Sequence, residues 1–100
     1  MSENYNVVTN DFQIAASLKN NAIGISYYSG LGVIQDYNKA LFYFRLAAAK
    51  GNADAQYNLG RMYLFGEGVN PDLKEVLRLF KLAADQGHLA ATFNPCVGTI

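Results

Sequence analysis

Two aspartates, Asp36 and Asp72, have the residue type and regular spacing that first suggest chemistry. A pair of carboxylates can divide the roles of general acid and general base between them. Each aspartate, however, precedes a run of apolar residues at helical spacing, and aspartate is a preferred N-cap because its carboxylate accepts hydrogen bonds from free backbone N–H groups. We therefore interpret both residues as helix caps rather than as a catalytic pair.

Two glycine-rich turns, Gly30-Leu31-Gly32 and Gly66-Glu67-Gly68, resemble parts of a phosphate-binding loop. Neither completes the GxGxxG pattern, and a predicted helix rather than a strand precedes each of them. Glycine in the left-handed conformation commonly ends a helix. Both turns are therefore predicted to be helix ends, and no nucleotide cofactor is expected.

The only histidine, His88, and the only cysteine, Cys96, are the remaining candidates for metal or nucleophilic chemistry. A metal site needs further ligands, and a nucleophilic cysteine needs a base and an orienting group. His88 follows the helix-ending Gly87, so we expect it in a helix N-cap region or on the surface, and we expect Cys96 to be a plain thiol. The sequence thus predicts no metal site, no cofactor and no catalytic centre, and hence a protein that is not an enzyme.

The composition is that of one small domain without net charge. Eight Lys and Arg residues balance eight Asp and Glu residues over 100 residues, so no excess positive charge favours nucleic acid. Apolar residues make up 51% of the chain, which is too many for a disordered protein, yet no apolar run is long enough to span a membrane. Residues 1–6 lack the features of a secretory signal, and we expect a cytoplasmic protein with neither a nucleic-acid partner nor membrane insertion.

The two halves of the sequence match when one is shifted by 36 residues, and such a fixed period indicates a repeat architecture. The identities fall at positions where packing or turn geometry requires a particular residue. They include Gly24 with Gly60, Tyr27 with Tyr63, Gly30 with Gly66, Asp36 with Asp72, Phe44 with Phe80, and Ala47-Ala48 with Ala83-Ala84.

Each copy is predicted to be a hairpin of two helices. In the second copy, Asn52 caps a helix over about 53–65. Asp72 caps the next helix, with Glu75 completing a capping box. An apolar stripe runs down that helix and consists of Leu73, Val76, Leu77, Phe80, Ala83 and Ala84. In the first copy, the first helix is predicted to end near Ser29 and the second to cover about 37–50.

Gly24 and Gly60 lie inside the predicted first helices, where glycine costs about 1 kcal/mol relative to alanine. Close contact with the second helix would compensate for that cost. We expect the alanine pairs of the second helices to form a flat surface against which Tyr27 and Tyr63 pack. A single hairpin cannot cover its own apolar face, so adjacent hairpins must stack.

The residue pattern of the second copy closely resembles the Sel-one-like repeat (SLR), a relative of the tetratricopeptide repeat. The resemblance rests on Ala55-Gln56-Tyr57-Asn58-Leu59-Gly60-Arg61-Met62-Tyr63, Gly66-Glu67-Gly68-Val69, Asp72, Phe80-Lys81-Leu82-Ala83-Ala84 and Gly87. It implies an all-α fold, an α-solenoid of helix-turn-helix hairpins that serves as a protein-interaction scaffold. Two SLR units plus an N-terminal helical segment are expected.

We expect one domain over residues 1–100. An N-terminal helical segment at about 10–19, capped by Thr9 or Asn10, either joins the first helix or acts as a cap. Repeat 1 then covers 20–55, repeat 2 covers 56–91, and 92–100 is a truncated third repeat or tail. Pro95 stands there in place of an expected leucine, and proline fits only the first turn of a helix.

One face of the two predicted first helices is the candidate binding surface. Leu59 and Tyr63 are predicted to face inward, which leaves other positions on a stripe spaced by four, three and four residues. We name these residues the concave stripe: Ala22, Ile25, Ser29, Asp54, Asn58, Arg61 and Phe65. A solvated surface is the alternative interpretation, although phenylalanine and isoleucine are unusual choices for it.

The sequence therefore predicts a non-catalytic scaffold or adaptor that binds a segment of another protein on its concave face. Ile25 and Phe65 are expected to be apolar anchors, and Asn58 and Arg61 to orient the segment by hydrogen bonds. The alternative is a truncated structural fragment of a longer repeat array that self-associates into a homo-oligomer through its open C-terminal face.

Overall fold

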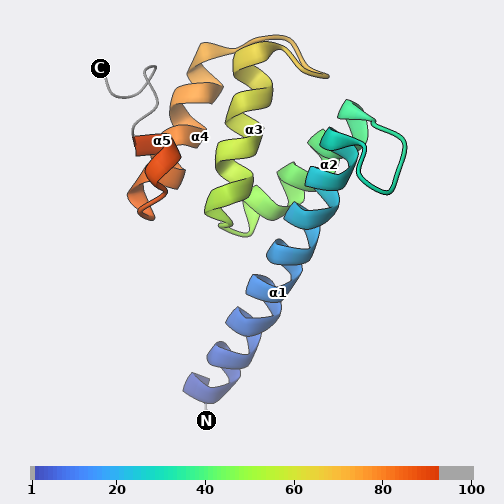
Figure 1. Ribbon diagram of the computed structural model, residues 1–100. Helices are drawn as coiled ribbons and strands as arrows, with labels where there is room; N and C mark the ends of the chain where they lie inside the picture. The colour runs from blue at the N-terminus through green and yellow to red at the C-terminus, as the bar shows by residue number, and fades with distance from the viewer. Residues whose placement is uncertain (1, 93–100) are drawn as a thin grey trace.

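Two stacked helical hairpins make up most of the structure (Figure 1). The computed structural model describes residues 2–92, with side chains from residue 12 onward. Its helices are α1 (Ser2–Ser29), α2 (Tyr37–Ala49), α3 (Ala53–Phe65), α4 (Leu73–Asp85) and α5 (Leu89–Thr92), and the described part of the chain contains no strand. α1 packs on α2, α2 on α3, and α3 on α4. The predicted all-α solenoid of hairpins is confirmed.

The helices begin where the sequence predicts, because their caps are local. The Asp36 carboxylate accepts a hydrogen bond from the backbone N–H of Lys39 at 3.1 Å, and Asn52 Oδ1 accepts one from Ala55 at 2.8 Å. Asp72 Oδ1 accepts from the N–H groups of Lys74 and Glu75 at 3.1 and 3.3 Å. Asp36 and Asp72 are therefore helix caps, as expected.

The predicted capping box at the start of α4 does not form. The Glu75 carboxylate binds Arg78 instead, at 2.8 Å from Nε and 2.9 Å from the terminal nitrogen. The backbone N–H of Asp72, which a capping box would satisfy, donates to the carbonyl of Tyr63 at 3.3 Å. The Arg78 guanidinium, one turn away, thus takes the Glu75 carboxylate, and the Tyr63 carbonyl of the preceding helix takes the Asp72 N–H.

The two glycine-rich turns end the first helices, as predicted. Gly66 is the C-cap of α3 with a φ of 68°, and Gly30 follows α1 with a φ of 74°. Both values lie in the left-handed region that favours glycine. The turns therefore have a structural role, because their geometry ends one helix and directs the chain toward the next.

Gly24 and Gly60 allow the close contact between helices that we expected to compensate for their low helix propensity. A Cβ placed on Gly24 would lie 2.6 Å from ring atoms of Phe44, and one on Gly60 would lie 2.6 Å from Phe80. The rings that fill these gaps are therefore phenylalanines of the second helices. Tyr27 and Tyr63, which we expected to pack against the alanine pairs of the second helices, border the cores and remain partly exposed.

The core consists of two clusters that join successive helices, the first across α2, α3 and α4 and the second across α4 and α5. The first comprises Ala40, Leu41, Phe44, Leu59, Met62 and Leu79, and the second comprises Val76, Phe80, Ala83 and Ala91. The predicted stripe on α4 is correct at Val76, Phe80 and Ala83. It is wrong at Leu73, which is 60% exposed, and it omits the buried Leu79.

The expected N-terminal helical segment is continuous with the first helix. α1 runs without a break from Ser2 to Ser29, so Thr9 and Asn10 lie within it and do not cap a new helix. Its N-terminal half extends beyond the other helices, where Phe12, Ile14 and Leu18 are exposed (Figure 1). Of the two expected arrangements, the joined helix is the one observed.

A short fifth helix follows the second hairpin. α5 packs on α4, and its Ala91 is fully buried in the second core cluster. Ala91 lies 36 residues after the equally buried Ala55, so α5 has the position of a further first helix. The expected interruption at Pro95 and the thiol of Cys96 lie outside the described residues, and self-association through the C-terminal face stays a prediction. None of the described helices is both long and apolar enough to cross a membrane.

Candidate partner-binding surface

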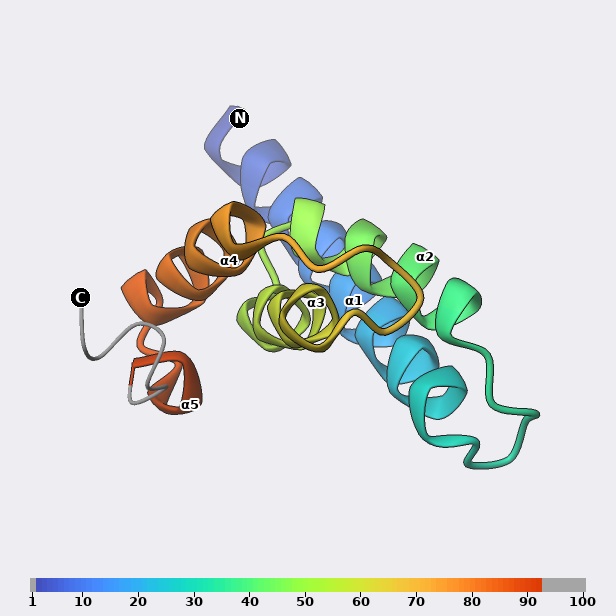
Figure 2. The ribbon, with the colours of Figure 1, turned by 90° about the horizontal axis from the view of Figure 1, so that it is seen from above.

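The concave stripe converges on one pocket between the first helices of the two hairpins. Seen from above, α3 lies between α4 and the α1–α2 hairpin (Figure 2). A pocket of about 250 Å³ opens there and is lined by Ile25, Tyr28, Ser29, Phe44, Asn58 and Arg61. Four of these six belong to the stripe that the sequence predicts. The 36-residue period thus places residues from two repeats around one cavity.

Three members of the stripe lie outside the pocket lining. Ala22 is exposed on α1, Phe65 at the end of α3 is 61% exposed, and the Asp54 side chain is 67% exposed. Phe65 and Ile25, which is 41% exposed, are the large apolar side chains of the stripe, and both remain open to solvent. An apolar surface therefore extends along the stripe beyond the pocket.

Tyr28 and Phe44 line the pocket although the sequence does not predict either of them there. Phe44 lies against Gly24 through the contact described above, and the glycine-to-phenylalanine spacing that the two copies share is a signal that could have revealed it. Tyr28 follows Ile25 by three residues, which is one helical turn. Its role depends on a residue far along the chain, which periodicity cannot show.

The Tyr28 hydroxyl joins α1 to the glycine-rich turn of the second repeat. It donates to the Glu67 carboxylate, with its oxygen 2.7 Å from Oε1 and 2.9 Å from Oε2. Desolvation by burial, followed by this hydrogen bond, raises the pKa of Tyr28 from 10.0 to about 12. The phenol therefore stays protonated, and the contact fixes the wall of the pocket that Tyr28 forms.

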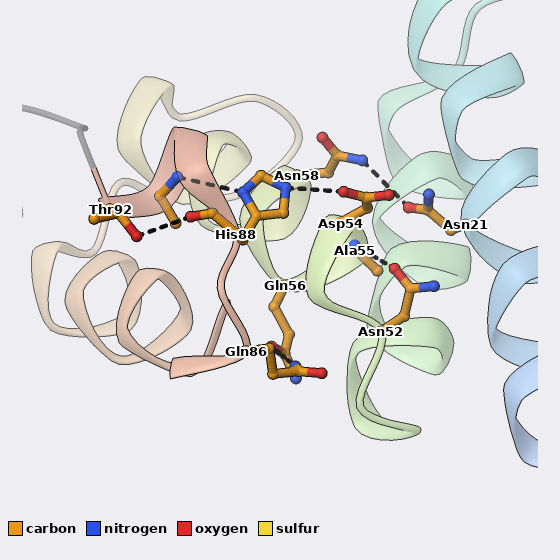
Figure 3. A network of polar contacts seen from close by, with 10 residues as sticks. Asn21, Asn52, Asp54, Ala55, Gln56, Asn58, Gln86, His88 and Thr92 are labelled. Carbon is orange, nitrogen blue, oxygen red and sulfur yellow. Dashed lines mark hydrogen bonds and ion pairs between the residues drawn. The ribbon is translucent and has the colours of Figure 1, made fainter. Parts of the chain in front are cut away.

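A second polar contact joins the two first helices directly. Asn58 Nδ2 on α3 donates to Asn21 Oδ1 on α1 at 3.2 Å (Figure 3). Asn21 is 8% exposed, so this contact is made largely out of solvent and orients the Asn58 amide. The Asn58 oxygen forms no hydrogen bond within the described part of the chain.

His88 connects α5 to the stripe. Its Nδ1 accepts a hydrogen bond from the backbone N–H of Ala91 at 3.3 Å, and its Nε2 lies 2.8 Å from Asp54 Oδ1 (Figure 3). An accepting Nδ1 places the proton of the neutral ring on Nε2, which then donates to Asp54. Of the two expected positions, the N-cap region is the one observed. A surface position is wrong, because the side chain is 15% exposed and its ring stacks on Tyr57 at 4.8 Å.

The Arg61 guanidinium is the cation of the pocket. It lies 5.8 Å from the ring centroid of Tyr57, within the range of a cation–π contact. The contacts of basic side chains with carboxylates among residues 12–92 involve Arg78, Lys81 and His88, and none involves Arg61. This guanidinium, with five N–H donors, thus lines the pocket without a carboxylate partner from the described residues.

The arrangement is one that can bind and orient a ligand. Asp36 and Asp72 are engaged as caps, and no three His, Cys, Asp or Glu side chains of the described residues gather in a group that could hold a metal ion. The pocket instead combines aromatic and aliphatic walls with a cation, an amide and a hydroxyl. That combination is typical of recognition sites.

Comparison with known protein families finds the same repeat in both hairpins. The model of the Sel1 repeat matches residues 20–52 and 53–88, which correspond to the two hairpins. The chain belongs to the Sel1 repeat family. Sel1 repeats form non-catalytic scaffolds that typically mediate protein–protein interaction. No curated protein matches the chain.

Two solved structures are similar to this Sel1 repeat chain. One is a protective antigen present in uropathogenic Escherichia coli strains that displays an SLR fold, 41% identical over 76% of this chain with a TM-score of 0.74. The other is a Sel1 repeat protein from Oxalobacter formigenes, 39% identical over 76% of this chain with a TM-score of 0.73. The present chain covers 16% and 31% of the lengths of those proteins.

Proposed function

We propose that this Sel1 repeat chain is an adaptor that binds a segment of a partner protein along the concave stripe. The observation that carries the proposal is the pocket whose lining combines Ile25 and Ser29 of α1 with Asn58 and Arg61 of α3. The residues of one repeat alone do not form it. Both repeats therefore contribute to one recognition surface.

The size of the pocket supports a peptide segment as the ligand. Its volume of about 250 Å³ lies below the range of roughly 300–1,000 Å³ that is usual for small-molecule sites. A single side chain of a partner segment suits such a pocket better than a whole cofactor does. The rest of the segment would lie along the stripe and contact the exposed Phe65.

The test uses a peptide library, since a library samples many sequences at once and does not depend on an identified partner. Peptides displayed on phage are selected on the immobilised chain, and the strongest binders are synthesised and measured by fluorescence anisotropy. We expect Arg61→Glu and Phe65→Ala each to weaken binding by tenfold or more, because truncation of a central anchor costs about 1–2 kcal/mol or more. Circular dichroism should show unchanged helix content.

The matched control is Lys74→Glu, which changes the charge by the same amount at an exposed position of α4 outside the pocket lining. Its affinity should equal that of the unchanged chain. Selected peptides that bind the Arg61→Glu and Phe65→Ala variants as tightly as the unchanged chain would exclude the concave stripe as the binding surface.

A further inference from the structure

The free cation of the pocket indicates what the partner segment carries. Arg78 binds Glu75 and Lys81 binds Asp85, whereas Arg61 has no carboxylate partner among residues 12–92. A guanidinium presents planar pairs of N–H donors that match the two oxygens of a carboxylate. Arg61 also lines the pocket, where an arriving group can reach it.

The carboxylates that border the stripe already have partners. Both oxygens of Glu67 accept from the Tyr28 hydroxyl, and Asp54 Oδ1 accepts from His88. These contacts tie the two acidic side chains to α1 and to the start of α5. The Tyr28 hydroxyl and the neutral His88 ring hold these carboxylates in place without cancelling their charge, and Arg61 is the one charged residue among the described residues of the pocket lining.

The other polar groups of the pocket suit a peptide backbone. The Asn58 nitrogen donates to Asn21, which leaves the Asn58 oxygen to accept a hydrogen bond from an amide N–H of a ligand. The Ser29 hydroxyl is exposed beside it and forms no hydrogen bond within the described residues. A donor for a carboxylate and an acceptor for a backbone amide thus lie on the same edge.

The position of the pocket within the stripe argues for an internal residue of the partner. Asp54 and Ala22 precede the pocket on α3 and α1, and the exposed Phe65 follows it. A segment that ended at Arg61 would leave one end of this surface, either Asp54 and Ala22 or Phe65, uncovered. A segment that continues past the pocket would contact Phe65 as well.

We infer that the partner segment carries an acidic side chain next to an apolar one. The carboxylate binds the Arg61 guanidinium, and the apolar side chain enters the pocket between Ile25 and Phe44. This inference rests on the proposed function, because it specifies the chemistry of the segment that the concave stripe binds.

The experiment compares peptides that differ in one functional group. A selected peptide is synthesised with an acetylated N-terminus and an amidated C-terminus, once with its internal Glu or Asp and once with Gln or Asn there. We expect the amide form to bind about five- to tenfold more weakly, the effect of a charge-assisted contact at a partly exposed site. The chain with Arg61→Gln should bind both forms equally, and Lys74→Gln should keep the preference.

The outcomes separate this inference from the proposed function. Selected peptides that lack acidic residues, or that bind equally in both forms, overturn the inference while the stripe remains the binding surface if Phe65→Ala still weakens them. A peptide without acidic side chains whose free C-terminal carboxylate restores an Arg61-dependent preference overturns it too, because the charge then comes from a chain end. Binding that is insensitive to every stripe variant overturns both proposals.

Discussion

The close contact between Gly60 and Phe80 makes the stability of this fold sensitive to one methyl group. In an open helix, Gly→Ala stabilises by about 1 kcal/mol through helix propensity. Here the added Cβ would lie 2.6 Å from Phe80 Cε1 and 2.7 Å from Cδ1, on a ring that is fully buried. Overpacking of this kind costs about 1–3 kcal/mol. Because the ring is fully buried, we expect the overpacking cost to outweigh the propensity gain, so that Gly60→Ala lowers the free energy of unfolding by up to about 2 kcal/mol in net terms.

Urea unfolding followed by circular dichroism at the helix band measures this change. Phe80→Leu is the matched background, since the smaller side chain removes the ring that meets the new methyl group. In that background, Gly60→Ala should be at least about 1 kcal/mol less harmful than in the unchanged chain. Gly24→Ala, whose Cβ meets Phe44 at the same 2.6 Å, should destabilise in the same way. A Gly60→Ala variant with a higher urea midpoint than the unchanged chain would refute the close-contact account.

Two further predictions concern the polar contacts around the stripe. In the folded chain, burial and the hydrogen bond to Glu67 raise the pKa of Tyr28 to about 12, against 10.0 for an exposed phenol. The unfolded chain therefore releases this proton first, and raising the pH from 10 to 12 favours the unfolded state. The stability advantage over Tyr28→Phe in urea titrations should therefore shrink across that range, and a constant difference would contradict it. His88→Ala should lower the stability of the fold by about 1 kcal/mol or more in thermal unfolding, because α5 loses its cap. His88→Asn should recover part of this stability, because asparagine also caps helices. Equal losses of stability in the two variants would argue against the cap.

The sequence predicts the helices well because their boundaries depend on local chemistry. Asn52 and Asp72 bond to N–H groups two or three residues ahead, and Gly66 ends α3 through its own φ angle. Such interactions depend on residues within a few positions of each other in the sequence. The capping box at Glu75 fails because Arg78, one turn further along, competes for the carboxylate.

The stripe could be predicted in part, because helical periodicity shows which positions share a face. It correctly groups Ile25, Ser29, Asn58 and Arg61, which the structure brings to one pocket. Periodicity does not show which distant side chains meet across the interface between helices. The bond from Tyr28 to Glu67 joins residues 39 positions apart, and it follows only once the register of the two hairpins is known.

The hydrogen bond between His88 and Asp54 also joins residues far apart in the sequence. The sequence predicts Asp54 as a member of the stripe but not its contact with His88, which reaches it from the start of α5, 34 residues later. His88 and Asn52 occupy equivalent positions of successive units, and each caps its helix. Equivalence in the repeat therefore predicts the cap, while the contact with Asp54 depends on how the units stack.

Chemical-shift mapping of a selected peptide on the isotope-labelled chain tests the central claim most directly. The account predicts that the largest shifts occur at backbone amides of α1 and α3 around Ile25, Asn58, Arg61 and Phe65, and that the Arg61→Glu variant needs at least tenfold more peptide to reach the same shifts. Shifts confined to α4 and α5, with the amides of the concave stripe unchanged, would contradict it.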